Sequence, residues 1–194
     1  MGLFGKKRKG YSENRLLGDP LLPIPTHLKD IFYATGNKNC ESYVCGKIIC
    51  SCKCGCFKVR IYAEEVNGSP YIREYKDGYA MVVKASCEGC EKEHLILDIS
   101  KHGWDGFICR EGVTVPDEEL SLRSCPKCGC ENHSIEICIH SDGKADFIDE
   151  IADCSLSDDF DEDDWVDAFG CMGIGLKCLG CGRNYSYLID YEAS

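Results

Sequence analysis

Apolar and polar residues alternate in six short segments of this chain, which is the pattern of β-strands with one buried face. The segments form three pairs that occur in the same order in both halves of the chain: Phe57–Ile61 with His133–Ile137, Met81–Ala85 with Met172–Leu176, and His94–Asp98 with Tyr185–Ile189. A repeated order of elements indicates an internal duplication. We therefore predict two related units, each with three antiparallel strands.

The duplication divides the chain into three parts. Residues 1–39 form a leader, residues 40–118 form unit 1, and residues 119–194 form unit 2. In each unit a long excursion separates the first two strands, and a pair of cysteines separates the second strand from the third. The predicted fold class is mainly β, of the α+β type, with two pseudo-repeated antiparallel units.

The leader combines a basic tip with an extended segment. Lys6–Lys9 is the densest basic run of the chain, and it is expected to be a solvated tip. Prolines up to Pro25 exclude regular helix before that residue. Thr26 can cap a short helix that runs through Phe32 and ends near Gly36.

The two excursions differ in character. In unit 1, the turn signals Asn67-Gly68 and Asp77-Gly78 predict a hairpin between residues 63 and 78. In unit 2, residues 141–170 form an acidic insertion with apolar residues at helical spacing, including Trp165. Because carboxylates are favourable at helix N-termini, this insertion predicts two short amphipathic helices.

Cysteine is unusually frequent, with 17 residues in a chain of 194. The N-terminus lacks a signal-peptide pattern, and no apolar run reaches membrane length, so we expect a cytoplasmic protein without a membrane segment. Thiols stay reduced in that compartment. Closely spaced cysteine pairs therefore indicate metal ligands rather than disulfides.

Unit 2 contains two complete metal-binding turns, Cys125-Pro-Lys-Cys128-Gly129 and Cys178-Leu-Gly-Cys181-Gly182. Thiolates at this spacing can bind one ion, and the glycine after the second ligand permits a positive φ. In unit 1, Cys87-Glu-Gly-Cys90 occupies the corresponding place after the second strand. On these motifs both units resemble the zinc-ribbon superfamily. That resemblance implies one structural Zn²⁺ ion in each unit.

The remaining ligands of unit 1 are ambiguous. Aligning Cys54-Gly55 with Cys128-Gly129 leaves Ser51 where the partner cysteine should be. We choose Cys52 and Cys54 with Cys87 and Cys90, while Cys50 in place of Cys52, or Cys54 paired with Cys56, stay open. The ligand pairs also lie farther apart than in ordinary zinc ribbons, with 32 residues between Cys54 and Cys87 and 49 between Cys128 and Cys178.

The predicted metal ligands are accordingly Cys52, Cys54, Cys87, Cys90, Cys125, Cys128, Cys178 and Cys181. The nine other cysteines are expected to be reduced thiols that act as small buried hydrophobic residues, and Cys138 is expected in the core: Cys40, Cys45, Cys50, Cys56, Cys109, Cys130, Cys138, Cys154 and Cys171. The pattern does not distinguish zinc from iron at sites with four thiolates.

These features favour a binding module over an enzyme. Four protein thiolates leave no coordination position for water, so such an ion stabilises a fold and does not activate a nucleophile. The formal net charge of −11 disfavours binding to a phosphate backbone. We expect a non-catalytic protein-interaction module whose acidic surface around Trp165 binds a basic protein partner.

Two other functions remain as alternatives. Other zinc ribbons suggest, by analogy, a nucleic-acid-binding or transcription-associated protein. The exposed-looking turn His102-Gly-Trp-Asp105 places an imidazole, an indole and a carboxylate close together and is a candidate catalytic fragment. The oligomeric state is left open by the sequence.

Overall fold

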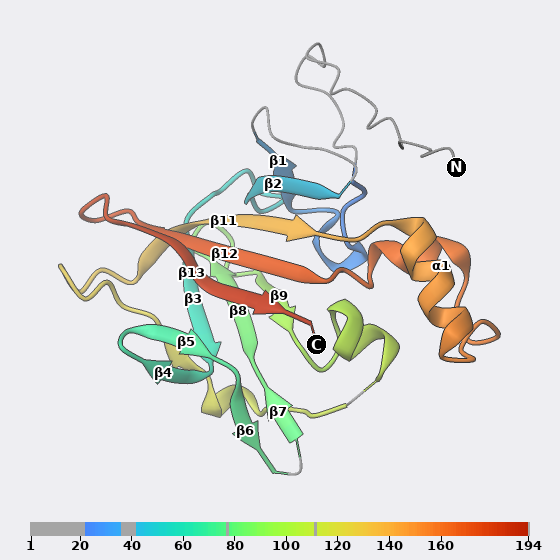
Figure 1. Cartoon of the computed structure of the whole chain (residues 1–194). Coiled ribbons are helices and arrows are strands. Elements are labelled where there is room, and N and C mark those ends of the chain that lie inside the picture. The colour runs from blue at the N-terminus through green and yellow to red at the C-terminus, as the bar shows by residue number, and fades with distance from the viewer. Residues whose placement is uncertain (1–21, 36–41, 77, 111, 194) are drawn as a thin grey trace, which may run out of the picture.

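The computed structural model describes residues 22–35, 42–76, 78–110 and 112–193. The basic run Lys6–Lys9, Gly36 and Cys40 lie outside the described residues. Within the described ranges the protein is mainly β, and most strands belong to one antiparallel sheet (Figure 1). No helix in these ranges is long and apolar enough to cross a membrane.

The main sheet contains two three-stranded meanders, one from each half of the chain. β3, β8 and β9 pair in sequence, as do β11, β12 and β13. β11 joins the meanders because its first residues pair with β3, while its later residues pair with β2, which in turn pairs with β1. The strands are β1 (Phe32–Ala34), β2 (Tyr43–Ile48), β3 (Phe57–Tyr62), β8 (Val82–Cys87), β9 (Glu93–Asp98), β10 (Ser121–Leu122), β11 (Asn132–His140), β12 (Cys171–Cys178) and β13 (Asn184–Glu192).

Alternation along these strands creates the core, as the sequence predicts. The inward residues of both meanders lie in one buried cluster, together with Leu22, Leu28 and Ile31 from the leader. The strand residues of this cluster include Phe57, Val59, Ile61, Val83, Ala85, Ile135, Ile137, Ile139, Met172, Ile174 and Leu176. The leader therefore packs on the body of the protein.

The helix predicted after Thr26 is wrong beyond Leu28. A 3₁₀ turn, η1, spans Thr26–Leu28, and the chain then becomes β1. Phe32 pairs with Ile48 of β2, and its ring occupies the space that a side chain at Gly46 would need. Sheet pairing and burial of the Phe32 ring outweigh the weak helical preference of so short a segment.

The excursion of unit 1 contains two hairpins. β4 (Glu64–Val66) pairs with β5 (Ser69–Tyr71), and β6 (Arg73–Tyr75) pairs with β7 (Gly78–Ala80). Asn67 and Gly68 have φ angles of 53° and 83°, as the connecting turn of a two-residue hairpin requires. The predicted hairpin at these residues is confirmed, and the second hairpin adds to it.

The acidic insertion contains α1 (Lys144–Asp153) and a 3₁₀ helix, η4 (Glu162–Val166). Phe147 and Ile151 of α1 pack with Ile108 and Ala168 in a small separate core. The Asp161 and Asp164 side chains cap the start of η4 in a reciprocal capping box. Two other short helices, η2 (Trp104–Ile108) and η3 (Asp117–Glu119), lie between β9 and β10.

A disulfide joins Cys45 of β2 to Cys138 of β11. The expectation of reduced thiols is wrong for these two cysteines, and Cys138 is half-buried rather than in the core. Its neighbours Ile137 and Ile139 are buried, so alternation turns Cys138 to the opposite face. There it lies directly across from Cys45, with a Cα–Cα distance of 4.1 Å.

The expectation of burial is also wrong for Cys109 and Cys154, which are exposed.

Candidate metal centres

Site 2 is the group formed by Cys125, Cys128, Cys178 and Cys181, and all four sulfur atoms lie within 4.8 Å of one another. Two of these distances, from Cys125 Sγ to Cys181 Sγ and from Cys128 Sγ to Cys178 Sγ, are 3.6 Å. Four thiolates bound tetrahedrally to zinc would stand about 3.8 Å apart. The sulfurs of site 2 therefore have the spacing that a single zinc ion requires.

Two tight turns hold the ligands of site 2. The backbone N–H groups of Cys128 and Gly129 both donate to the Cys125 carbonyl, and Gly182 N–H donates to the Cys178 carbonyl. Gly129 and Gly182 have φ angles of 71° and 72°. Glycine adopts this left-handed conformation without steric cost, which explains its position immediately after each second ligand.

Site 1 is the group formed by Cys50, Cys52, Cys87 and Cys90, whose four sulfur atoms also lie within 4.8 Å of one another. The distances from Cys50 Sγ to Cys90 Sγ and from Cys52 Sγ to Cys87 Sγ are both 3.5 Å. Of the four ligands predicted for unit 1, the structure brings together Cys52, Cys87 and Cys90. Cys50 takes the place in the group that the sequence interpretation had given to Cys54.

The backbone of the first turn explains this exchange. Cys50 N–H donates to the Cys54 carbonyl, just as Cys125 N–H donates to the Cys130 carbonyl in site 2. Between those residues, Lys53 has a φ of 71°, the same value as Gly129. Cys54 thus corresponds to Cys130, Lys53 corresponds to Gly129, and the turn of site 1 is one residue shorter.

The packing of Cys54 agrees with that correspondence. A side chain at Gly89 would place its Cβ 3.0 Å from the Cys54 Cβ, and one at Gly180 would place its Cβ 2.8 Å from the Cys130 Cβ. Cys54 and Cys130 thus pack against the glycine of the opposite turn rather than joining the four sulfurs. A gapless alignment of Cys54–Phe57 with Cys130–His133 contains this signal, which the alignment on Cys54-Gly55 misses.

The surroundings of the first ligand in each site favour its thiolate form. The backbone N–H of Cys52, together with the His94 side chain, lowers the pKa of Cys50 to about 5. The Tyr185 hydroxyl lowers the pKa of Cys125 to about 5. Metal binding requires the thiolate, so both positions are suited to hold a cation.

The two sites adjoin the place where the meanders meet. Phe57 of β3 pairs with His133 of β11, and these residues stand three positions after Cys54 and Cys130. On either side, Glu88 N–H donates to the Cys56 carbonyl and Leu179 N–H donates to the Asn132 carbonyl. Phe57 and His133 hold corresponding positions in the two meanders. Because they pair in an antiparallel arrangement, sites 1 and 2 are related by an approximate local two-fold axis.

The turn His102–Asp105 is packed rather than exposed. The His102 ring stacks on the His27 ring with 3.6 Å between centroids, and its Nδ1 accepts a hydrogen bond from Asp98 N–H. Burial lowers the pKa of His102 to about 3, so the ring is neutral at pH 7. Asp105 accepts a hydrogen bond from the Tyr191 hydroxyl. Both side chains therefore make contacts that hold the leader and β13 in place.

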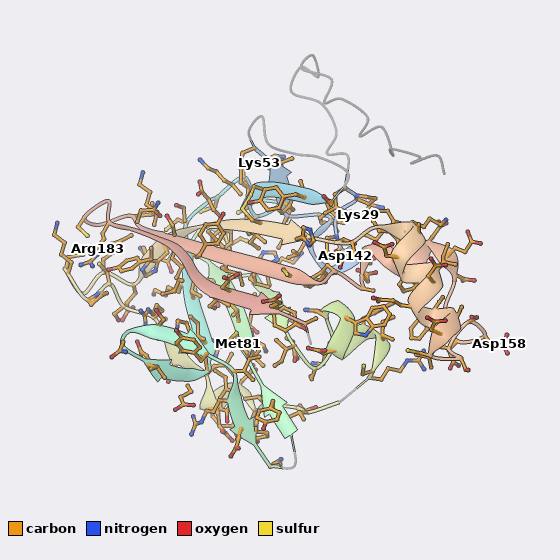
Figure 2. The ribbon with its side chains drawn as sticks, viewed as in Figure 1. Lys29, Lys53, Met81, Asp142, Asp158 and Arg183 are labelled. Atoms are coloured by element: carbon orange, nitrogen blue, oxygen red, sulfur yellow. A yellow bond between two sulfur atoms is a disulfide. The ribbon has the colours of Figure 1, made fainter. Side chains whose placement is uncertain are left out.

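Negative charge is concentrated in the insertion. Residues 141–170 contain 12 carboxylates and one lysine, while the 21 acidic and 21 basic residues elsewhere cancel. In Figure 2, acidic side chains surround α1, with Asp142 at the start of the insertion and Asp158 beyond the helix. A groove of about 380 Å³ crosses this region, and its lining includes Trp104, Asp142, Asp146, Phe147, Glu150 and Asp153.

Comparison of the chain with models of protein families, with curated proteins and with solved structures finds no significant match.

Proposed function

We propose that sites 1 and 2 each bind one structural zinc ion and that the chain is a non-catalytic protein-interaction module. The observation that carries the first part is the presence of two groups of four cysteine sulfurs, each within 4.8 Å. Thiolate is the ligand type that zinc accepts in closed structural sites. An ion in either site would connect the turn before the first strand of a meander to the turn between its second and third strands.

The experiment for this part is elemental analysis of the purified full chain. We expect two zinc ions per chain, and a Cys50→Ser variant should retain one. A Cys54→Ser variant serves as the discriminating control, because Cys54 lies outside the group, and it should retain two. A wild-type chain that contains no metal would contradict the proposal, and iron in place of zinc would correct the identity of the ion.

The second part of the proposal is that the insertion binds a basic segment of a partner protein. Its charge supports this, because 141–170 accounts for the whole formal net charge of −11. The groove beside α1 adds apolar contact surface, since Trp104 and Phe147 lie among its carboxylates. A basic segment with an aromatic side chain would complement both properties.

This part is tested with a short arginine-rich peptide that contains one central phenylalanine, titrated into the full chain by calorimetry. The double variant Asp146→Asn with Glu150→Gln removes two charges from the groove. We expect it to weaken binding by roughly two- to thirtyfold, since exposed charge pairs contribute about 0.2–1 kcal/mol each. Salt should weaken binding to the wild type as well.

The matched control is Asp158→Asn with Asp159→Asn, which removes the same charge from two exposed positions outside the groove lining. A smaller loss in the control than in the groove variant supports the groove as the binding surface. Equal losses would assign the attraction to the overall charge of the insertion. Failure of the wild type to bind the peptide would overturn this part and leave the metal sites unaffected.

A further inference from the structure

In each cysteine group, one sulfur lies within hydrogen-bonding distance of a side chain from the strand that follows the second turn. His94 Nε2 lies 3.4 Å from Cys50 Sγ in site 1. In site 1 the hydroxyl of the adjacent Ser51 also lies 3.9 Å from Cys50 Sγ. The Tyr185 hydroxyl lies 3.2 Å from Cys125 Sγ in site 2. In both sites, the sulfur that receives the bond belongs to the first cysteine of the first turn.

The two donors occupy corresponding positions. His94 follows Cys90 by four residues, and Tyr185 follows Cys181 by four residues. Both lie in the strand that leaves the second turn, β9 in site 1 and β13 in site 2. The same bond thus occurs twice in the protein, with an imidazole in one half and a phenol in the other.

Both donors are held in place by their neighbours. His94 is buried, and its ring stands edge-on to Phe57 with 6.2 Å between centroids. Tyr185 packs against the main core, and the Arg183 guanidinium lies 5.2 Å from its ring centroid. A donor that is fixed before the ion arrives aligns its hydrogen bond without a further loss of conformational entropy.

We propose that His94 and Tyr185 are positioning residues that hold the Cys50 and Cys125 thiolates on their metal ions. This inference rests on the metal binding proposed above. An ion with four thiolates carries a net charge of −2, and a hydrogen bond to sulfur disperses part of it. Partners of this kind typically change metal affinity by about 10–100-fold.

The test uses the full chain with Tyr185→Phe and, separately, His94→Phe. We expect each variant to bind two ions and to release one of them to a colorimetric chelator about 10–100-fold faster than the wild type. With Co²⁺ in the sites, the sulfur-to-cobalt charge-transfer band should move to lower energy, because a thiolate without its donor is easier to oxidise. A purely structural role would leave that band unchanged.

Two further variants separate the hydrogen bond from general packing. Tyr187→Phe removes a hydroxyl from an exposed tyrosine of the same strand and should leave both the release rate and the band unchanged. His94→Gln keeps an N–H donor and should restore much of the slow release. If Tyr185→Phe binds two ions with the wild-type release rate and band, the inference is overturned while the proposed metal binding stands. Absence of metal from the wild type would instead remove the proposed function itself.

Discussion

The two cysteine groups reach nearly the same geometry with different residues. In site 2 the left-handed positions are Gly129 and Gly182, whereas in site 1 Lys53 and Glu91 adopt φ angles of 71° and 61°. A residue with a Cβ pays about 1–2 kcal/mol for that conformation. Site 1 therefore holds its four cysteines together despite a backbone cost that site 2 avoids. The comparison indicates that the spacing of the sulfur atoms does not by itself determine the stability of a metal site.

The largest expected effect is loss of one ligand from either site. We expect Cys87→Ser and Cys178→Ser each to retain one ion, with a large loss of stability, because binding of structural zinc contributes about 10–16 kcal/mol in small peptides. Cys178→Ser should keep only the ion of site 1, and Cys87→Ser should keep only the ion of site 2. We expect a chelator to remove the ion from Cys178→Ser at a lower chelator concentration than from Cys87→Ser. Competitive titration measures this order, and the exposed Cys154→Ser is the control. The reverse order would show that site 1 is the firmer site.

A smaller effect is expected from substitution of the left-handed residues in either site. Gly129→Ala and Gly182→Ala should each destabilise the protein by about 1–2 kcal/mol. Apart from the adjacent residues, no atom of the described part of the chain lies within 4 Å of a Cβ built at either glycine, so the backbone alone would cause the loss. Lys53→Gly should be stabilising or neutral, since the strain that it relieves is offset by the entropy of glycine in the unfolded chain. Denaturant unfolding of the metal-loaded protein measures these changes, and destabilisation by Lys53→Gly would contradict the assigned strain.

The smallest effect is a difference in pH dependence between the halves. His133 is buried where unit 1 has Phe57, and burial lowers its pKa below the value of about 6.5 for an unfolded chain. The unfolded chain therefore binds the proton more readily. The contribution of His133 to stability is complete above about pH 6.5 and declines as the pH falls below it, by at most about 1.4 kcal/mol per pH unit.

Urea unfolding between about pH 5.5 and 7.5 tests this point, with His133→Phe compared against the wild type. We expect the variant to lose less stability on acidification. His27 and His102, whose pKa values are also lowered by burial, are present in both proteins and do not affect the difference. Parallel pH curves would show that His133 is not held in its neutral form.

The sequence predicted the parts of the fold whose signals are local. Alternation located the six strands of the two meanders, and Asn67-Gly68 located a hairpin because few other pairs adopt the required turn. The four cysteines of site 2 were readable because Gly129 and Gly182 mark the end of each turn. The structure places all four together.

The parts that could not be predicted depend on distant contacts or on an unusual residue. In the first turn of site 1 the left-handed residue is Lys53 instead of a glycine. The sequence Cys54-Gly55 resembles the end of such a turn, so the sequence alignment was displaced by two residues. The Cys45–Cys138 disulfide depends on pairing between β2 and β11, which are far apart in sequence. For Phe32, pairing with β2 decided between helix and strand.

The pairing of Phe57 with His133 also has a meaning for assembly. In a homodimer, a contact between the same residues of two copies is called isologous, and here the two partners belong to one chain. A chain that ended before β10 would expose this edge of β3, where β10 and β11 now pair. In this chain β11 covers the part of that edge at Phe57 and shields it from intermolecular strand pairing.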